Sequence, residues 1–279
     1  MTETPDPPIW RYMDLAKYVG LLSRGLFFAR PSTFSDAWEG CWSEADVLAF
    51  KSANRGADAA LLNTKWSESY RAKTQQLETL GINCWHQNEE ESYALWGLYM
   101  PRGMGVAIRS SVKRVLGALA KADRIIHVCE VRYERVTAVM MDGLPIELLS
   151  RKRPEFAHER ELRFVTTLRN DELSAIESLE EMLNDRQHRH ASTADGPLIR
   201  VGRAYGSFDK SLVRRTAPGG VHLPTDLSVL IEEVRLGRDV SYPVRRAVID
   251  ATVTFGLDAR LIKEGPTHQA PPDQIIFHD

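Results

Sequence analysis

The sequence is poor in cysteine and has no long hydrophobic run. Its three cysteines, Cys41, Cys84 and Cys129, are an odd number, stand far apart and form no C-x-x-C pair. This usage argues against a disulfide framework and a zinc knuckle and suits a reducing cytoplasm. No apolar stretch approaches the roughly 18 residues that a spanning helix needs, and the N-terminal residues lack the pattern of a signal peptide. We therefore expect a cytoplasmic protein without membrane association.

An excess of charge of one sign is also missing, and so are the common site motifs. A formal net charge of −2 over 279 residues gives no electrostatic argument for a nucleic acid or an acidic membrane as a general partner. The chain has no G-x-G-x-x-G motif, P-loop, G-x-S-x-G, H-E-x-x-H or EF-hand loop. The "HRH" of His188–His190 stands in a charged segment without a third ligand nearby, so we predict no metal site.

What is present is an ordinary globular composition, with 43% hydrophobic and 27% charged residues. Residues 1–8 read as a disordered proline-rich tail and residues 265–279 as an extended C-terminal tail. Residues 9–264 are expected to form a single domain, with helical insertions at about 43–80 and 171–195. The predicted strands are short and follow no regular βαβ period. This order favours an α+β fold with a central split or mixed β-sheet flanked by helices.

The first informative stretch is residues 81–110, "GINCWHQNEEESYALWGLYMPRGMGVAIRS". It predicts a strand at 82–87, a helix at 89–99 and, after a Pro-Gly break, a second strand. On that helix Ser92, Trp96 and Tyr99 follow at i, i+4 and i+7 and share one face. A polar, aromatic segment between two strands is a candidate site, and a core helix with tryptophan anchors is the alternative.

The second informative stretch is "RKRPEFAHERELRFVTTLRN", at residues 151–170. Its end alternates like a strand, which predicts Glu159, Glu161, Arg163 and Val165 on one face. Two carboxylates and an arginine on one face indicate a charged site. The alternative is a solvated edge with cross-strand ion pairs.

Four segments together resemble a bacterial family labelled "domain of unknown function 2971", at scattered positions over most of residues 9–256. The family has an aromatic-basic-aromatic opening strand, a cysteine-aromatic strand before a tryptophan helix, and an E-x-E-x-R strand. His86 departs from the serine that the family usually has at this position. The segments are "WRYMDLAKYVGLLSRGLFFARPSTFSDAWEG", "CWHQNEEESYALWGLYMPRGMGVAIR", "RKRPEFAHERELRF" and, more weakly, "LIEEVRLG".

The layout of this family is similar to that of ADP-ribosyltransferase-like folds, which bind NAD in a cleft of a split α+β sheet. This analogy implies an order of arginine, aromatic-polar element and E-x-E along the chain. By it the catalytic residues are Glu161, Glu159 and Arg11. The residues expected to contact NAD are Trp85, His86, Ser92, Trp96, Tyr99 and Arg163.

The residue types suit such chemistry. Cleavage of the nicotinamide–ribose bond passes through an oxocarbenium-like state, which the carboxylate of Glu161 or Glu159 can stabilise. An arginine fork, from Arg11 or Arg163, suits the pyrophosphate or the ribose. An aromatic ring such as Tyr99 or Trp96 can stack on nicotinamide. His86 can bond a ribose hydroxyl, or be a satisfied histidine of a strand.

The leading hypothesis is therefore an ADP-ribosyltransferase-like enzyme, a toxin or phage-defence effector, which uses NAD as a substrate. Its partners would be a small nucleotide ligand and a protein or nucleic-acid target that the sequence does not identify. The first alternative is a non-catalytic sensor or interaction module, in which the Glu/Arg face and the Trp/Tyr helix form a buried structural network.

The second alternative is a metal-dependent nuclease. Asp36, Glu39, Glu159 and Glu161 would assemble a Mg²⁺ site in that case. The lysine that usually follows such an acid is missing, because "ERELR" has leucine and Arg163 there.

Overall fold

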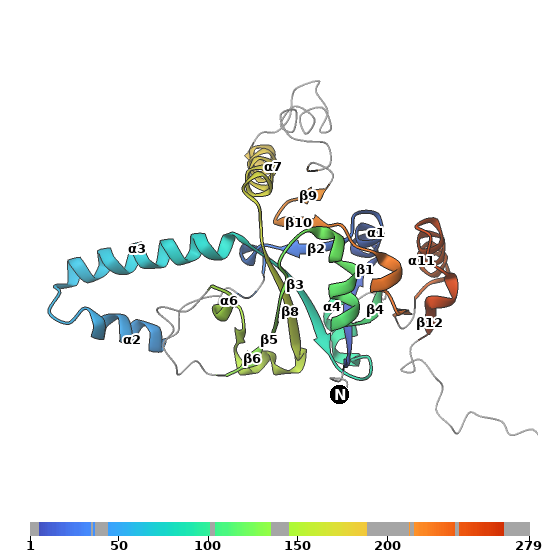
Figure 1. Ribbon diagram of the computed structural model, residues 1–279, viewed down its shortest axis with the longest axis horizontal. Coiled ribbons are helices and arrows are strands. Elements are labelled where there is room, and N and C mark those ends of the chain that lie inside the picture. Colours follow the sequence, from blue (N-terminus) through green and yellow to red (C-terminus); the bar gives the residue numbers. More distant parts are fainter. Residues whose placement is uncertain are drawn as a thin grey trace, which may run out of the picture. The chain divides into compact units, whose positions relative to one another are not determined.

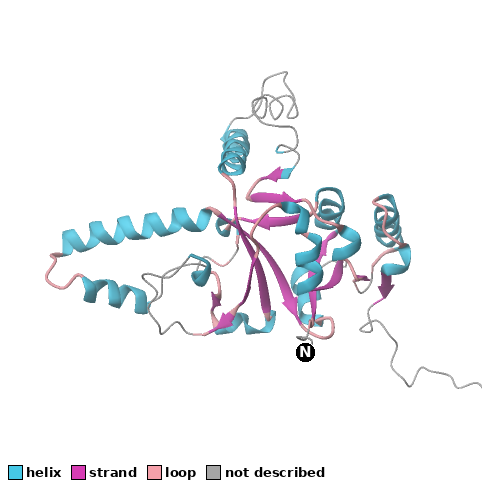
Figure 2. Cartoon of the chain, in the orientation of Figure 1, coloured by secondary structure: helices cyan, strands magenta, loops and turns pink. Residues whose placement is uncertain are grey.

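The computed structural model describes mixed β-sheet flanked by helices, so the protein is a mixed α/β protein (Figure 2). The residues that it describes are 6–34, 36, 44–100, 104–134, 145–188, 212, 215–237 and 240–264. The predicted C-terminal tail, residues 265–279, lies outside them. No helix in the described part of the chain is both long and apolar enough to span a membrane.

The chain divides into two compact units, and both are discontinuous in sequence. Unit 1 takes its residues from 1–25, 85–123 and 224–279. Unit 2 takes its residues from 26–84 and 124–223. Strand β3 (Leu80–Gln87) gives its first residues to unit 2 and its last residues to unit 1.

The sheet of unit 1 is built on β1 (Pro8–Asp14). This strand pairs antiparallel with β4 (Gly105–Ser111) along its whole length, with Trp10 opposite Arg109, and with the end of β3. On the other side of β4, the strand β11 (Glu233–Leu236) is antiparallel, and β12 (Ile262–Glu264) lies parallel to β11.

The side chains of this sheet alternate between its two faces, and helices pack against the apolar ones. Trp10 and Tyr12 pack in one cluster with Leu95 and Trp96 of α4 (Tyr93–Tyr99). The helix α1 (Leu15–Arg24) follows β1 directly and is joined to α11 (Tyr242–Thr254) by a 2.9 Å hydrogen bond between Tyr18 and Thr252. The other helical segments of unit 1 include α5 (Val112–Ala118), η2 (Ala120–Ala122), α10 (Leu227–Leu230) and η4 (Ala259–Leu261).

Unit 2 contains the strands that carry the E-x-E-x-R stretch. The strand β8 (Glu161–Thr167) lies between β3 and β5 (His127–Glu130), with Arg163 opposite Cys129. Its Val165 packs in a core cluster with Leu77, Ile82 and Leu149. The remaining strands are β2 (Leu26–Ala29), β9 (Thr216–Ala217), β10 (Gly220–Leu223) and the short parallel pair β6 (Arg132–Tyr133) and β7 (Arg151–Lys152).

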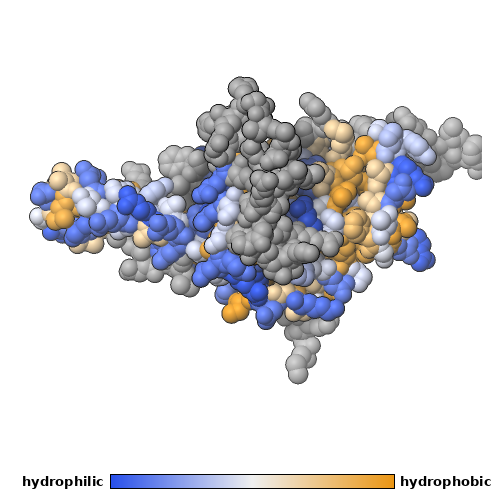
Figure 3. Space-filling view, turned by 90° about the horizontal axis from the view of Figure 1, so that it is seen from above, coloured by the Kyte–Doolittle hydropathy of each residue, from blue (hydrophilic) through white to orange (hydrophobic). Residues whose placement is uncertain are grey.

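Two helices of unit 2, α2 (Glu44–Ala53) and α3 (Ala59–Glu78), form a helical hairpin (Figure 1). Phe50 and Trp66 join them in an edge-to-face ring contact. The hairpin surface, on the left in Figure 3, is mainly hydrophilic with a few apolar patches. Leu48 of α2 and Leu61 of α3 are exposed. The other helical segments of unit 2 include η1 (Pro31–Thr33), α6 (Pro145–Leu148), η3 (Pro154–Glu159) and α7 (Asn170–His188).

Most of the predicted elements are confirmed. They include the strand expected at 82–87, which is part of β3, the strand expected after the Pro-Gly break, which is β4, and the helices expected within 43–80. The predicted helix at 89–99 begins later than expected, because Ser92 is the N-cap of α4 and its hydroxyl accepts the Leu95 amide proton. Ser92 therefore caps the helix instead of lying on its face.

Two glycines, Gly97 within α4 and Gly105 at the start of β4, test the packing of unit 1. A Cβ at Gly105 would stand 1.8 Å from the Met100 sulfur and 2.4 Å from the Met13 carbonyl oxygen. A Cβ at Gly97 would meet no atom within 4 Å. We expect Gly105→Ala to lower the free energy of unfolding by about 1–3 kcal/mol through overpacking. Gly97→Ala should raise it by about 0.5–1 kcal/mol through helix propensity. Equal shifts in urea titrations of the two variants would contradict this packing.

Candidate functional site

The nine predicted site residues are divided between the two units. Unit 2 holds Glu159, Glu161 and Arg163, and unit 1 holds the rest. The predicted meeting of Arg11 with Glu161 stays a prediction.

In unit 2 the two glutamates do not lie on one strand. Glu159 ends the 3₁₀ helix η3, and β8 begins only at Glu161. Between them Arg160 has a φ of 39°, in the left-handed region that few residues other than glycine adopt. The prediction of Glu159 on the strand face is therefore wrong, because the chain turns at Arg160 before the strand starts.

Lys152 nevertheless brings the two carboxylates together. Its Nζ lies 2.6 Å from a carboxylate oxygen of Glu159 and 3.6 Å from one of Glu161. The side chains of all three residues are largely buried, with exposed fractions of 9%, 14% and 11% for Lys152, Glu159 and Glu161. The ring of Phe156 lies 4.8 Å from the Lys152 nitrogen and holds it by a cation–π contact.

Arg163 lies behind this pair and is completely buried. Its Nη2 donates to Glu161 at 2.6 Å, its Nη1 donates to the Leu149 carbonyl at 2.6 Å, and its guanidinium lies over the Phe34 ring. A fully buried guanidinium cannot meet a dissolved ligand. Arg163 therefore holds Glu161, and its predicted contact with NAD has no support from this position.

The charges around Glu161 keep it ionised. Burial raises the pKa of its carboxyl, but the charges of Arg163 and Lys152, with hydrogen bonds from Arg163 and Cys84, outweigh it and hold the pKa below its usual value. The Glu161 amide also donates to the Tyr133 hydroxyl at 2.7 Å. Burial raises the pKa of Tyr133 to about 12, so this hydroxyl stays protonated at neutral pH.

In unit 1 the sheet separates Arg11 from the predicted aromatic site. Tyr12 lies 5.2 Å from Trp96 and 6.3 Å from His86 between ring centroids, so these three share one face. Arg11 neighbours Tyr12 on β1 and points to the opposite face. Trp85 neighbours His86 on β3 and also points to the opposite face. The structure thus brings His86 and Trp96 together, and places Arg11 and Trp85 on the other side.

Most of the aromatic residues expected to contact NAD belong to the core. Trp85, His86 and Trp96 are 2%, 5% and 7% exposed. Tyr99 is 50% exposed, so it is the aromatic residue of this set that a ligand can reach. The alternative of a core helix with tryptophan anchors therefore describes Trp85 and Trp96 better than a stacking role does.

The sequence analysis missed Glu91, which is buried while Glu89 and Glu90 are exposed. Its carboxylate accepts the indole proton of Trp96 at 3.1 Å and lies 3.8 Å from Arg235. The position of Glu91 directly before the Ser92 N-cap was the feature of the sequence that could have indicated its role.

Of the residues of the nuclease alternative, only Glu159 and Glu161 are seen to approach each other in the described part of the chain. There, no group of three or more His, Cys, Asp and Glu side chains is placed to hold a metal ion. Asp36 bonds Arg153 at 3.0 Å, and Glu39 lies outside the described residues.

Comparisons with known proteins add no assignment. No family model, curated protein or solved structure matches the chain. The resemblance to the family of unknown function and the ADP-ribosyltransferase-like layout stay predictions.

Removal of Arg163 tests whether it neutralises Glu161. Arg163→Met leaves a buried carboxylate without its main partner, and we expect a loss of about 3–5 kcal/mol in the free energy of unfolding at pH 7. The double variant Arg163→Met/Glu161→Gln should regain part of that loss, because the remaining group is neutral. Chemical denaturation of the wild type, Arg163→Met and the double variant checks this. Glu130→Gln, on the exposed face of β5, is the control. A double variant less stable than Arg163→Met would contradict the pairing.

Acid should weaken the same pair. The pKa of Glu161 is lower in the folded protein than in the unfolded chain, so its contribution is present above the unfolded value and is lost as pH falls through the folded value. The difference in unfolding free energy between the wild type and Glu161→Gln should shrink below pH 4.5, the ordinary value. A constant difference between pH 7 and pH 3 would contradict it.

Proposed function

We propose that the protein is an ADP-ribosyltransferase-like enzyme that uses NAD as its substrate, with Glu161 as the central catalytic residue. The observation that supports this best is the approach of Glu159 and Glu161 to one lysine, with Glu161 held ionised by Arg163. Paired carboxylates of which one stays anionic suit cleavage at an anomeric carbon.

The chemistry assigns a task to each carboxylate. When the bond between ribose C1′ and the nicotinamide nitrogen breaks, the bonding electron pair leaves with neutral nicotinamide and C1′ becomes positive. The Glu161 carboxylate would stabilise that charge. Glu159, which is ion-paired with Lys152, would accept the proton of the nucleophile that forms the new bond to C1′.

The residues near this pair fit a dinucleotide in part. Arg163 is fully buried, but Arg153 is 47% exposed and could meet a pyrophosphate. Arg153 also lies 5.2 Å from the centre of the Phe156 ring, which limits its movement. The roles in NAD binding that the family resemblance implies for Arg11, Ser92 and Tyr99 of unit 1 stay predictions.

The biological setting follows from the same resemblance. We infer a cytoplasmic toxin or phage-defence effector whose ADP-ribosyl acceptor is a protein or a nucleic acid. The separation of the cysteines in sequence agrees with that compartment.

A second candidate function is a non-catalytic sensor or interaction module. The observation in its favour is the burial of the network, since Arg163 is 0% exposed and the side chain of Glu161 only 11%. In this reading the Glu161–Arg163 pair fixes β8 within unit 2 and contacts no substrate.

A measurement of NAD cleavage by the purified protein separates the two candidate functions. Wild-type protein should release nicotinamide from NAD, and Glu161→Gln should lower the rate at least about a hundredfold, because the developing positive charge loses its counter-charge. Glu159→Gln should lower transfer to acceptors more than NAD cleavage. Glu130→Gln is the matched control and should keep the wild-type rate.

Failure of the folded protein to bind or consume NAD would favour the sensor function. Wild-type protein that neither binds NAD at millimolar concentration in calorimetry nor consumes it, while remaining folded, would contradict the enzymatic proposal. Folding of each variant is checked by thermal melting.

A further inference from the structure

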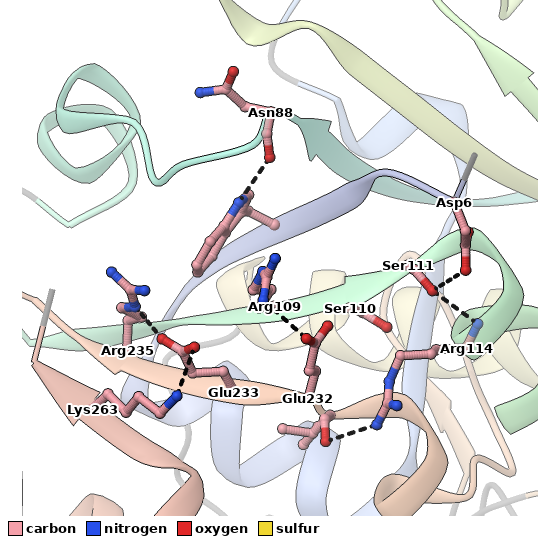
Figure 4. Close-up of polar contacts among 12 residues, drawn as sticks. Asp6, Asn88, Arg109, Ser110, Ser111, Arg114, Glu232, Glu233, Arg235 and Lys263 are labelled. Atoms are coloured by element: carbon pink, nitrogen blue, oxygen red, sulfur yellow. Dashed lines mark hydrogen bonds and ion pairs between the residues drawn. The ribbon is translucent and has the colours of Figure 1, made fainter. Parts of the chain in front are cut away.

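A second cluster of charges lies on the sheet of unit 1, and Glu91, which bonds Trp96, links one of its arginines, Arg235, to the face of Tyr12 and Trp96. The register places Arg109 of β4 opposite Glu233 of β11, and Arg235 of β11 beside Lys263 of β12. Partners in register point to the same face of a sheet. Figure 4 shows Arg109, Glu233, Arg235 and Lys263 gathered on three neighbouring strands.

Trp10 of β1 orders the two arginines. Their guanidinium carbons lie 5.9 Å and 5.3 Å from the centre of its ring, for Arg109 and Arg235. The indole is 1% exposed and its nitrogen donates to the Asn88 carbonyl at 3.0 Å, so the ring cannot turn freely. An aromatic platform of this kind fixes guanidinium planes before a ligand arrives.

The acidic partners of these cations differ in how firmly they are held. Glu233 and Glu91 have side chains that are 5% and 1% exposed, and they pair with Arg235 from inside the cluster. Lys263 is 59% exposed and lies 3.3 Å from Glu233. The outer partner is Glu232, which is 40% exposed and accepts from Arg109 Nη1 at 2.9 Å.

The donors of the cluster that a ligand can reach are those of its outer side chains. Arg109 Nε and Arg235 Nη1 are buried and make no hydrogen bond within the described part of the chain, and Arg235 Nη1 lies 3.8 Å from a Glu91 oxygen. Arg109 and Lys263 have side chains that are 30% and 59% exposed. The Arg109–Glu232 pair lies at the surface, where an ion pair contributes little net stability. An anion with several oxygen atoms can therefore replace the Glu232 carboxylate at Arg109 Nη1 at small cost and also reach the ammonium group of Lys263.

We propose that Arg109, Arg235 and Lys263 form a binding site for the phosphate or diphosphate group of a small molecule. Glu232 holds Arg109 in place until that group binds and is then displaced to solvent. Trp10 and the buried Glu233 keep the two arginines in position. This site is independent of the E-x-E pair of unit 2, and its test does not require NAD turnover.

Isothermal titration calorimetry of the full chain with inorganic pyrophosphate and with ADP tests the proposal. Both should bind, they should compete with each other, and adenosine should not bind. Arg109→Met should weaken binding at least about tenfold, the size of one lost charged hydrogen bond. Lys263→Met removes an exposed side chain and should weaken binding while leaving the thermal melting temperature unchanged.

Glu232→Gln gives a prediction of opposite sign, because it removes the competing carboxylate. It should strengthen pyrophosphate binding by roughly twofold to fivefold. Arg246 and Asp250 form a comparable exposed ion pair on α11, so Arg246→Met and Asp250→Asn are the matched controls and should bind like the wild type. Absence of pyrophosphate binding at millimolar concentration would overturn the proposal. So would equal affinity in the wild type, Arg109→Met and Lys263→Met. ADP binding without pyrophosphate binding would also overturn it, because recognition would then rest on the nucleoside.

Discussion

The ion pair between Arg163 and Glu161 is the interaction on which unit 2 depends. A guanidinium that is fully withdrawn from water is tolerated only with a counter-charge and hydrogen-bond acceptors, which Glu161 and the Leu149 carbonyl supply. Lys152 adds a second positive charge 3.6 Å from the same Glu161 oxygen and also pairs with Glu159. One structural requirement, the neutralisation of a buried arginine, therefore also produces an ionised carboxylate beside a second one. That arrangement links the stability of unit 2 to its proposed chemistry.

The local elements could be predicted from the sequence because their causes are local. The period of apolar residues predicts α1, Asp14 is a typical N-cap for that helix, and the alternation of side chains predicts β8. The placement of Glu159 could not be predicted in this way, because a strand pattern of period two continues through Arg160 as if the backbone were extended. The left-handed conformation of Arg160 interrupts that pattern, and nothing in its residue type announces it.

The candidate site was harder to predict, since it depends on which strands become neighbours. The alternation of side chains along a strand already predicts that Arg11 and Tyr12 point to opposite faces. It does not predict that α4 covers the face of Tyr12, which is what excludes Arg11 from the aromatic cluster. Residues chosen for their chemistry, such as Trp85 and Trp96, then prove to be packing residues. Arg109 and Arg235, in contrast, were not predicted as site residues, because they stand 126 positions apart in sequence. Only the antiparallel pairing of β4 with β11 brings them to the same tryptophan ring.

Titration of the Glu161 side chain tests the central claim most directly. Carbon-13 labelling of the glutamate carboxyl groups, with Glu161→Gln to assign the resonance, would follow this group by NMR in the intact chain. The account predicts that the Glu161 resonance titrates below pH 4.5, its ordinary value, and that it shifts when NAD is added. Titration at or above that value, or a resonance that NAD leaves unchanged at saturating concentration, would contradict the claim that a buried ion pair holds a carboxylate ready for chemistry.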